Sequence, residues 1–298
     1  MSDQYNHEQM EKRIKVSIGM PVYNGEDFID EAIKSLLAQD EKEFELIISD
    51  NASTDNTSKI CRNHAAIDKR IRYISNHINI GAENNFKTVL TEANGEFFMW
   101  AAHDDTWEPS FLSTMLKLFN HNPNAAIAFS GFNNIDISGK EIRKYNLQEL
   151  TSQDLFERLF AFMQMEERKG KANVIYGLFK RQSILEQKGL FFESKGLWGA
   201  DMLSVFKILT SGYLALDDQI LFHKRLSSQH KYQKKIHQNI FDKLQYKIHE
   251  YRIYFHENHE YFSEYFKTIL SINGLALNQK AKFSFYLLIK EIYTAFHK

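Results

Sequence analysis

In the first half of the chain, short runs of apolar residues alternate with amphipathic segments, in which apolar and polar positions are mixed. Short apolar runs predict buried strands, and apolar residues that recur every three or four positions predict helices. The predicted strands and the helices between them cover residues 14–20, 26–38, 44–49, 53–60, 71–74, 86–93, 96–102, 111–119 and 126–130, in the order strand, helix, strand and so on. This alternation predicts an α/β fold with a mostly parallel sheet flanked by helices.

The second half of the chain is less regular. Residues 173–180 predict a strand, residues 181–189 a short helix, and residues 213–225 one or two further strands. An amphipathic helix is predicted at 201–211, and Gly212 follows it as a plausible C-cap. Beyond about residue 230 the chain reads as helical and aromatic-rich, so we expect a domain over residues 1–230 and a helical C-terminal extension over residues 231–298.

Composition excludes several classes of protein. The 298 residues carry a net charge of −1, which excludes the global basicity of a nonspecific nucleic-acid binder. The single cysteine, Cys61, excludes an intrachain disulfide. The first ten residues are polar, and the longest strongly apolar run near the C-terminus has seven residues, whereas a membrane span needs about 20. We therefore expect a soluble, cytoplasmic protein.

Charge is unevenly divided between the two predicted segments. Residues 231–298 carry 11 Lys and Arg against 6 Asp and Glu, which gives them a net charge of +5 and leaves −6 on the first 230 residues. Basic helices with many aromatic residues bind anionic membrane surfaces. The same aromatic residues would equally serve as core if these helices pack on the first domain or on a second subunit.

Three segments follow predicted strands, where open α/β sheets bind their ligands. They are PVYNGED at 21–27, SDNASTDNT at 49–57 and HDDTW at 103–107. Taken singly, each segment also fits a βα turn, a helix cap or an acidic surface turn. The adjacent carboxylates of the third segment repel each other, so a cation should offset them, and Mg²⁺ or Mn²⁺ carrying phosphates is the usual one. The glycine-rich patterns of dinucleotide-binding and P-loop proteins are absent.

Together the three segments resemble the family 2 glycosyltransferases, which have the GT-A fold. The resemblance rests on VSIGMPVYNGEDFIDEAIKSLLAQ, IISDNASTDNT, GEFFMWAAHDDTWEPSFL and GLWGADMLSVFKILTSG, and it covers about residues 14–230. It implies an inverting, metal-dependent transferase that moves a sugar from a nucleoside diphosphate donor, typically a UDP-sugar, to a hydroxyl acceptor. In bacteria the implied role is assembly of a surface polysaccharide, an O-antigen or a glycolipid at the inner face of the membrane.

The resemblance also implies roles for individual residues. Tyr23 would stack on the base, Pro21 would lie along it, and Asp50 would accept a hydrogen bond from a base N–H. Asp104 would lie near the ribose and the diphosphate, and Asp105 would ligate the Mn²⁺ or Mg²⁺ that bridges the diphosphate oxygens. Trp198 would form a wall for a sugar ring. The general base would be Asp201, and its place at the start of a helix favours the ionised form.

Three positions depart from the family pattern. Ala102 stands at the first acidic position of the metal motif, Asn51 replaces a second Asp in the base-binding segment, and Ala200 replaces an acidic residue before Asp201. Ala102 leaves fewer ligand oxygens for a metal and keeps open a non-catalytic module that binds sugar nucleotides or glycans. A sugar-1-phosphate nucleotidyltransferase is the other alternative, although its usual basic, glycine-rich loop is missing from residues 21–27.

Some further polar residues admit a functional interpretation beside a structural one. Asn85 could face the nucleotide or stabilise a turn, and Arg225 could pair with phosphate or with an acidic neighbour. His223 and His230 could reach the diphosphate or a metal, and both also fit a surface role. HENHE at 256–260 places two histidines three residues apart, with no third metal ligand evident.

Overall fold

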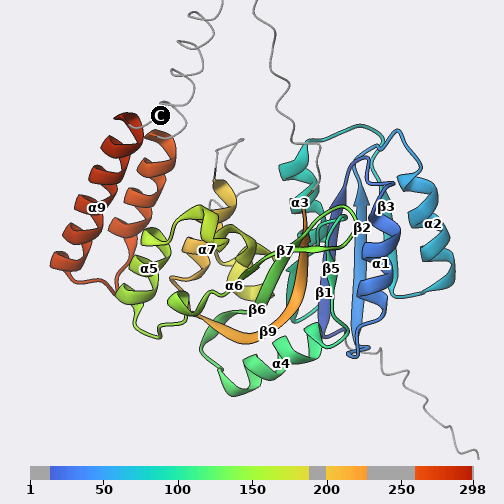
Figure 1. Cartoon of the computed structure of the whole chain (residues 1–298), viewed down its shortest axis with the longest axis horizontal. Coiled ribbons are helices and arrows are strands. Elements are labelled where there is room, and N and C mark those ends of the chain that lie inside the picture. Colours follow the sequence, from blue (N-terminus) through green and yellow to red (C-terminus); the bar gives the residue numbers. More distant parts are fainter. Residues whose placement is uncertain (1–13, 188–198, 227–258, 297–298) are drawn as a thin grey trace, which may run out of the picture.

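The computed structural model describes residues 14–187, 199–226 and 259–296, in which helices surround one sheet (Figure 1). The strands are β1 (Val16–Val22), β2 (Phe44–Asp50), β3 (Ile71–Ser75), β4 (Phe97–Trp100), β5 (Thr106–Trp107), β6 (Ala125–Ile135), β7 (Glu141–Tyr145), β8 (Leu178–Lys180) and β9 (Tyr213–Arg225). The α-helices with defined bounds are α1 (Ile29–Leu37), α2 (Thr57–Ile67), α3 (Ala82–Thr91), α4 (Phe111–His121), α5 (Leu155–Gln164), α6 (Arg181–Leu185), α7 (Ala200–Ile208) and α9 (Leu277–Phe296). Short 3₁₀ helices are η1 (Gln148–Leu150), η2 (Glu167–Lys169) and η3 (Lys171–Tyr176).

The sheet has a parallel half and a mixed half. Its strand order within the described residues is β3-β2-β1-β4-β8-β6-β9-β5, with β7 paired to β6. β1 runs parallel to β2 and β4, and β2 runs parallel to β3, which confirms the parallel βαβ arrangement predicted for the first half. In the second half, β8 is antiparallel to both β4 and β6, whereas β6 and β9 are parallel. The fold is therefore α/β with a mixed sheet.

The parallel half is packed closely at its centre. Every residue of β1 is buried, and a Cβ added at Gly19 would lie 2.7 Å from the Phe98 ring and 2.7 Å from a Val89 methyl. Only glycine leaves room for α3, which carries Val89, to approach β1 this closely. Because α3 packs tightly there, its first turn is fixed next to the carboxyl ends of β1 and β2.

The helices of the first half bury the stripes predicted for them. On α1 these are Ile29, Ala32, Ile33 and Leu36, and on α4 they are Phe111, Leu112, Met115, Leu116 and Phe119. Each large apolar side chain buried in this way stabilises the fold by about 1.5–3 kcal/mol. The loops after β1, β2 and β4 are therefore attached to a rigid frame.

The strand predicted at 173–180 is wrong for most of its length. Residues Lys171–Tyr176 form the 3₁₀ helix η3, and only Leu178–Lys180 forms a strand. The turn begins at Gly170, whose φ of 88° suits glycine, and Asn173 donates its amide to the Gly170 carbonyl at 3.0 Å. A short apolar run does not distinguish a strand from a buried helical turn, so periodicity alone misassigned this segment.

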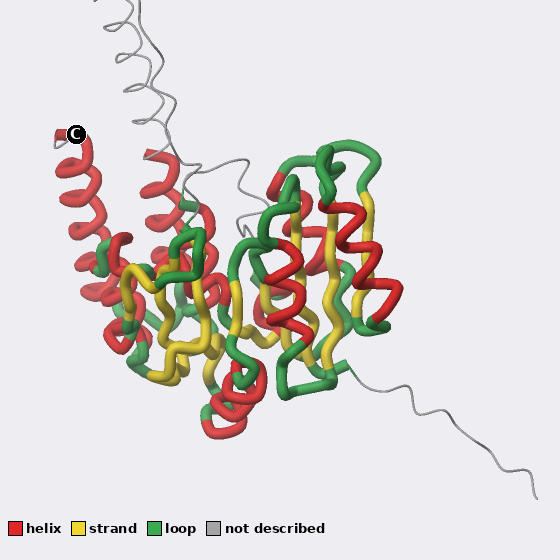
Figure 2. The backbone as a smooth tube through the Cα atoms, turned by 45° about the vertical axis from the view of Figure 1, so that its right-hand side comes forward, coloured by secondary structure: helices red, strands yellow, loops and turns green. Residues whose placement is uncertain are grey.

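The described part of the C-terminal segment consists of helical residues 259–271 and α9. These two helices stand side by side at the end of the molecule opposite α2 (Figures 1 and 2). Tyr265 packs on Phe206 of α7 with ring centroids 4.8 Å apart, and Phe283 packs on Phe156 of α5 at 5.2 Å. Tyr265 and Phe283 therefore pack on the first domain, which was one of the two arrangements expected for these aromatic side chains. No helix there is both long and apolar enough to cross a bilayer.

Candidate active site

A cavity of about 480 Å³ opens at the carboxyl ends of β1, β2 and β4. Its walls come from segments far apart in the sequence, because parallel strands bring their carboxyl ends to one edge of the sheet. The lining residues are Pro21, Val22, Tyr23, Asn51, Asn79, Ala82, Asn85, Phe86, Ala102, His103, Asp104, Tyr176 and Lys224. Three predicted site residues, Pro21, Tyr23 and Asp104, therefore meet at one cavity.

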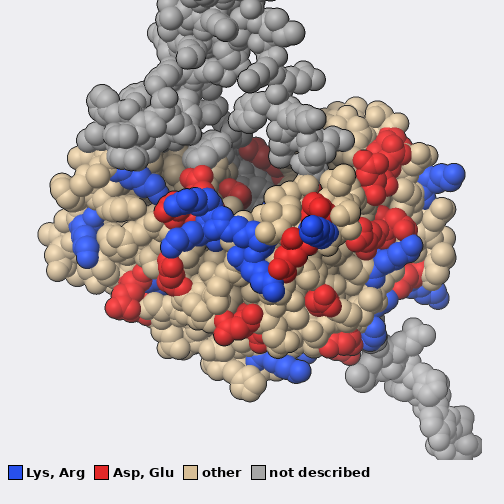
Figure 3. All heavy atoms as spheres, viewed as in Figure 1, with Lys and Arg blue, Asp and Glu red and all other residues tan. Residues whose placement is uncertain are grey.

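Surface charge does not by itself single out this cavity. Lys and Arg side chains gather in a band across the middle of the face in Figure 3, in the region of β7, with Asp and Glu side chains on both sides of it. Arg143 and Lys144 of β7 are exposed. Because both signs are interspersed, the candidate site has to be argued from the groups that line the cavity.

Hydrogen bonds of Asn24, the residue after Tyr23, join the loop after β1 to the loop after β2. The Asn24 amide donates to Ser53 Oγ at 2.9 Å, and Asn24 Oδ1 accepts from the Thr54 amide at 2.8 Å. Asn24 and Ala52 both have positive φ values, of 52° and 61°, which are strained for residues with a Cβ. These loops hold the Tyr23 ring at the mouth of the cavity with 46% of its surface exposed, which suits it to stack on a flat ligand.

Asp50 lies behind the cavity wall, and Asn51 reaches the wall instead. Asp50 is buried, its Oδ1 accepts from the Ser53 amide at 2.9 Å, and its Oδ2 accepts from the Tyr73 hydroxyl at 2.7 Å. Asn51 Oδ1 accepts from the Ile80 amide at 2.8 Å. Asp50 thus shapes the loop that carries Asn51.

Asparagine side chains form much of the wall beside Asn51. Asn51 Nδ2 donates to Asn79 Oδ1 at 2.9 Å, and Asn85 Nδ2 donates to the Ser49 carbonyl at 2.9 Å. Asn85 therefore both stabilises the end of β2 and lines the cavity. Asn51 and Asn79 were not predicted as site residues, although the asparagine-rich run at 76–85 was a usable signal, since amides both donate and accept.

Asp104 and Asp105 are adjacent in the sequence but have different surroundings. Asp104 lines the cavity, whereas Asp105 is fully buried. Asp105 Oδ1 accepts from the Arg225 amide at 2.8 Å, and among the described residues its Oδ2 has no hydrogen-bond partner. Burial raises the pKa of Asp105 to about 7, against the opposing attraction of Lys224. Asp104 is thus the carboxylate that a ligand in this cavity would meet first.

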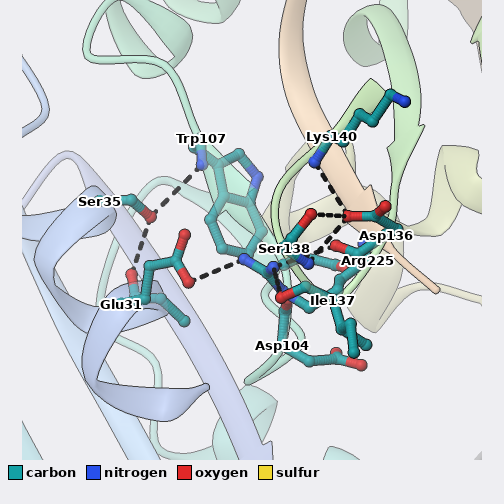
Figure 4. Close-up of polar contacts among 11 residues, drawn as sticks. Glu31, Ser35, Asp104, Trp107, Asp136, Ile137, Ser138, Lys140 and Arg225 are labelled. Carbon is teal, nitrogen blue, oxygen red and sulfur yellow. Dashed lines mark hydrogen bonds and ion pairs between the residues drawn. The ribbon is translucent and has the colours of Figure 1, made fainter. Parts of the chain in front are cut away.

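Arg225 fixes the segment that carries this carboxylate pair (Figure 4). Its Nε donates to the Asp104 carbonyl at 2.9 Å, and one terminal nitrogen lies 2.8 Å from Glu31 Oε2 on α1. The other terminal nitrogen donates to the carbonyls of Asp136 and Ile137 after β6, at 3.2 and 3.3 Å. Arg225 is buried and joins β9, α1 and two loops, so its role in the described structure is to position Asp104 and Asp105.

Lys224 brings a positive charge into the cavity, and sequence reasoning missed it. Its Nζ lies 3.9 Å from Asp105 Oδ2 and 4.9 Å from the centre of the Tyr176 ring. The neighbouring His223 contacts other residues: its Nδ1 lies 2.6 Å from Asn133 Oδ1, and its Nε2 lies 2.9 Å from Glu108 Oε1. These contacts give His223 a structural role. Since Lys224 comes 119 positions after Asp105, no local motif could have indicated that they meet.

Asp201 lies in the first turn of α7, as predicted. It does not line the cavity, but it is close enough to Lys224 for the two charges to interact. Its Oδ1 accepts from the Met202 amide at 2.8 Å, and Gly199 before it has a φ of 71°. Burial raises the pKa of Asp201, while this amide and Lys224 oppose the rise. The amide at the helix start favours the ionised form, but desolvation by burial is the larger effect and raises the pKa overall. A raised pKa makes the carboxylate a stronger base.

Two of the predicted residues cannot be placed. Trp198 and His230 lie outside the described residues, as do His256 to Asn258 of the HENHE segment.

The family assignment comes from comparison with known proteins. The model of glycosyl transferase family 2 matches residues 17–183, a region that contains every cavity-lining residue except Lys224. The chain belongs to glycosyl transferase family 2.

Relatives of the chain include proteins named for bacterial glycan synthesis. The chain is 29% identical over 180 residues to a Campylobacter jejuni GalNAc(5)-diNAcBac-PP-undecaprenol beta-1,3-glucosyltransferase, covering 58% of this chain and 54% of that protein. It is 31% identical over 130 residues to the putative teichuronic acid biosynthesis glycosyltransferase TuaG of Bacillus subtilis, covering 44% of this chain and 51% of that protein. The match thus spans about half the length of each of these relatives.

Solved structures show the same fold at low identity. The TarS residues 1–349 of S. aureus in complex with UDP superpose with a TM-score of 0.68 and 17% identity, covering 95% of this chain and 72% of that one. A mannosyltransferase of Pyrobaculum calidifontis, in complex with GDP-Man and Mn²⁺, has a TM-score of 0.58 and 15% identity, covering 95% of this chain and 72% of that one. These likenesses establish the GT-A fold of this family 2 member.

The donor set around Asp105 does not fit the divalent cation that sequence reasoning predicted there. Nowhere in the described ranges do three His, Cys, Asp or Glu residues gather in a way that could hold a metal ion. An ion about 2 Å from Asp105 Oδ2 would lie within about 6 Å of Lys224 Nζ. At an effective dielectric constant of about 20, a double and a single positive charge at that separation repel by about 5 kcal/mol. Among the described residues that line the cavity, Asp104 is the only one with a carboxylate.

Proposed function

We propose that this protein transfers a sugar from a nucleoside diphosphate donor to a hydroxyl acceptor. The observation that carries the proposal is one cavity, in a family 2 fold, that combines the flat ring of Tyr23 with Asn51, Asp104 and Lys224. An exposed ring suits a base, amides and a carboxylate suit base edges and ribose hydroxyls, and an ammonium suits phosphate.

The donor would lie across this cavity with its base at Tyr23. Pro21 would flank the base, and Asn51 would meet its polar edge. Asp50 would support this contact by holding the loop that carries Asn51. Asp104 would accept from the ribose. We propose uridine as the base, because a fold neighbour, TarS, is described with UDP and with UDP-GlcNAc.

Asp201 would act as the general base. It would take the proton of the acceptor hydroxyl, whose oxygen forms a new bond to the anomeric carbon. The bond from that carbon to the β-phosphate oxygen breaks, and its electron pair leaves with the nucleoside diphosphate. Attack from the face opposite the leaving group inverts the anomeric configuration. The raised pKa of Asp201 suits this role, because proton transfer is most efficient when the pKa of the base approaches the working pH.

We propose a glycan or lipid-linked glycan as the acceptor, in bacterial surface polysaccharide, O-antigen or glycolipid assembly. The Campylobacter relative is named for an undecaprenol-linked substrate, and the Bacillus relative for teichuronic acid biosynthesis. A lipid-linked acceptor would place the protein at the inner face of the cell membrane, in contact with it through the C-terminal helices. Ala102 keeps the non-catalytic binding module as the second candidate, because it removes one acidic group from the cavity wall.

A binding experiment tests the donor site. UDP, GDP, TDP and ADP are titrated into the protein by calorimetry, and at least one is expected to bind. Tyr23→Ala should weaken that binding about 5–100-fold, the range that loss of a stacking contact gives. Phe285→Ala removes a similarly exposed aromatic ring from α9 and should leave the affinity unchanged. If the Tyr23→Ala variant and the control bind with equal affinity, the proposal that the base stacks on Tyr23 in this cavity is wrong.

A further inference from the structure

We propose that Lys224, rather than a divalent cation at Asp105, neutralises the diphosphate of the donor. The inference rests on the proposed function, since it assumes that the cavity holds a nucleoside diphosphate. It names the group that would bind the leaving phosphates and predicts that this binding needs no added metal.

The position of Lys224 supports this role. Among the described residues that line the cavity, Lys224 is the only lysine or arginine. Its side chain is 28% exposed and lines the cavity, so a ligand there can reach it. It comes from β9, whereas Tyr23 and Asp104 come from the ends of β1 and β4, so a ligand that spans the cavity would reach all three.

The contacts of Lys224 hold its charge without using its donors. The Tyr176 ring, 4.9 Å away, attracts the ammonium through its π face, and the buried Asp105 carboxylate attracts it from 3.9 Å. Within the part of the chain that the structure describes, Nζ makes no hydrogen bond. An ammonium has three N–H donors, so phosphate oxygens can accept from it.

The lysine also accounts for the pair of adjacent carboxylates. Two carboxylates side by side require a compensating cation, and here Lys224 stands next to Asp105. Ala102 carries no ligand oxygen at the position where the family pattern has an acid, so this wall offers a metal less than the pattern implies. The fixed ammonium repels a divalent ion on Asp105 and so weakens its binding there, and the chain itself contains the ammonium.

The test compares nucleoside diphosphates with nucleosides in the presence of EDTA. UDP and uridine, and in parallel GDP and guanosine, are titrated into wild-type protein and into Lys224→Met, Lys224→Arg and Lys117→Met. Lys117→Met is the matched control, because Lys117 is an exposed lysine on α4. Since Lys224→Met leaves Asp105 buried without its counter-charge, the double variant Lys224→Met/Asp105→Asn is included, and thermal unfolding verifies that each variant folds.

We expect wild-type protein to bind the diphosphate in EDTA. Lys224→Met, alone and in the double variant, should weaken diphosphate binding about tenfold or more, the effect of losing a hydrogen bond to a charged group. Nucleoside binding should stay near the wild-type value in both, and Lys224→Arg should retain most of the diphosphate affinity.

Two results would overturn the inference and leave the proposed function standing. One is diphosphate binding that disappears in EDTA and returns with Mn²⁺. The other is a folded double variant that binds the diphosphate as tightly as wild type. If wild-type protein binds neither diphosphates nor nucleosides, with or without Mn²⁺, the proposed function itself fails and the inference fails with it.

Discussion

Lys171 and Lys224 sit in opposite electrostatic surroundings. Burial on its own would lower the pKa of Lys224, but Tyr176 and the carboxylates of Asp105, Asp104 and Asp201 raise it overall. Burial, together with the nearby charge of Lys290, lowers the pKa of Lys171 to about 7. Lys224 is thus a permanent cation in the candidate site, whereas Lys171 lies away from it and its charge opposes folding.

Lys171→Met should stabilise the fold in a pH-dependent way. The folded-state pKa of Lys171, about 7, lies below its ordinary 10.5, so the charge costs stability fully below pH 7, and the cost fades as the pH rises to 10.5. Although the variant loses the bond from Nζ to the Phe162 carbonyl, we expect a gain of about 1–4 kcal/mol at pH 6.5.

Urea unfolding at pH 6.5 and pH 9.5 measures this effect. The gain should shrink markedly at the higher pH, and Lys169→Met, at an exposed neighbouring position, should change stability little at either pH. A gain of the same size at both pH values would show that the charge of Lys171 is not the cause.

Some site residues were predictable from the sequence and others were not. Pro21, Tyr23 and Asp104 follow apolar strands directly, so the rule that ligands bind at carboxyl ends was sufficient to place them. Asp104 and Asp105 could not be told apart, because burial of Asp105 depends on Arg225, 120 residues later. Lys224 and Tyr176 were missed for the same reason, since they reach the cavity only through long-range pairing of the mixed half of the sheet.

At the scale of elements, α9 presents two aromatic residues in opposite environments. Phe283 is completely buried and contacts Phe156 and Phe160 of α5, with ring centroids 5.2 and 5.4 Å apart. Phe285, two positions later, is 66% exposed. The contrast between Phe283 and Phe285 shows which face of α9 packs on the first domain and which face is exposed to solvent.

Phe283→Ala should destabilise the fold much more than Phe285→Ala. Truncation of a buried phenylalanine costs about 3–5 kcal/mol through lost burial and a cavity, whereas an exposed position stays within about 0.5 kcal/mol. Chemical denaturation of both variants measures the difference. Equal stability of the two variants would mean that α9 is not packed on α5.

The exposed face of α9 suits contact with a membrane surface. Leu277, Phe285, Leu288 and Ile289 are 84%, 66%, 54% and 48% exposed. Lys280 and Lys282 lie on the same helix, and basic residues near apolar ones attract anionic lipids. We expect the protein to sediment with anionic vesicles at low salt and to be released at about 0.5 M salt, where screening shortens electrostatic reach to a few ångströms.

Neutral vesicles and the double variant Phe285→Glu/Leu288→Glu are the controls for this measurement. Both should abolish sedimentation. Folded wild-type protein that stays in the supernatant at low salt would contradict membrane contact, and sedimentation velocity would then report whether this face forms a dimer.

Element type was easier to predict than element pairing. The βαβ units of the first half follow from strict alternation of apolar runs and amphipathic stripes, and every predicted strand up to residue 130 exists. The antiparallel insertion of β8 between β4 and β6 has no local signal, because β8 is only three residues long. The same limit explains why residues 173–180 were misread as one strand.

At the scale of the whole molecule, the candidate site lies where the two halves of the sheet meet. The loops after β1, β2 and β4 of the parallel half contribute Tyr23, Asn51 and Asp104 to the cavity, and β9 of the mixed half contributes Lys224. Arg225, next to it on β9, ties the same strand to α1. Under the proposed function, the donor would lie along the parallel half, and the acceptor would lie near α7, which carries Asp201.

The central claim, that this family 2 member transfers sugars and uses Asp201 as its base, is tested most directly by donor hydrolysis. UDP-, GDP- and TDP-sugars are incubated without an acceptor, and the release of nucleoside diphosphate is measured for wild type, Asp201→Asn and the exposed control Asp218→Asn. We predict release from at least one donor by wild type and the control, and a rate lower by about 10²–10⁴-fold in Asp201→Asn, with donor binding retained. Binding of a donor without any release by wild type would favour the non-catalytic module, and release by Asp201→Asn at the wild-type rate would contradict the role of this carboxylate.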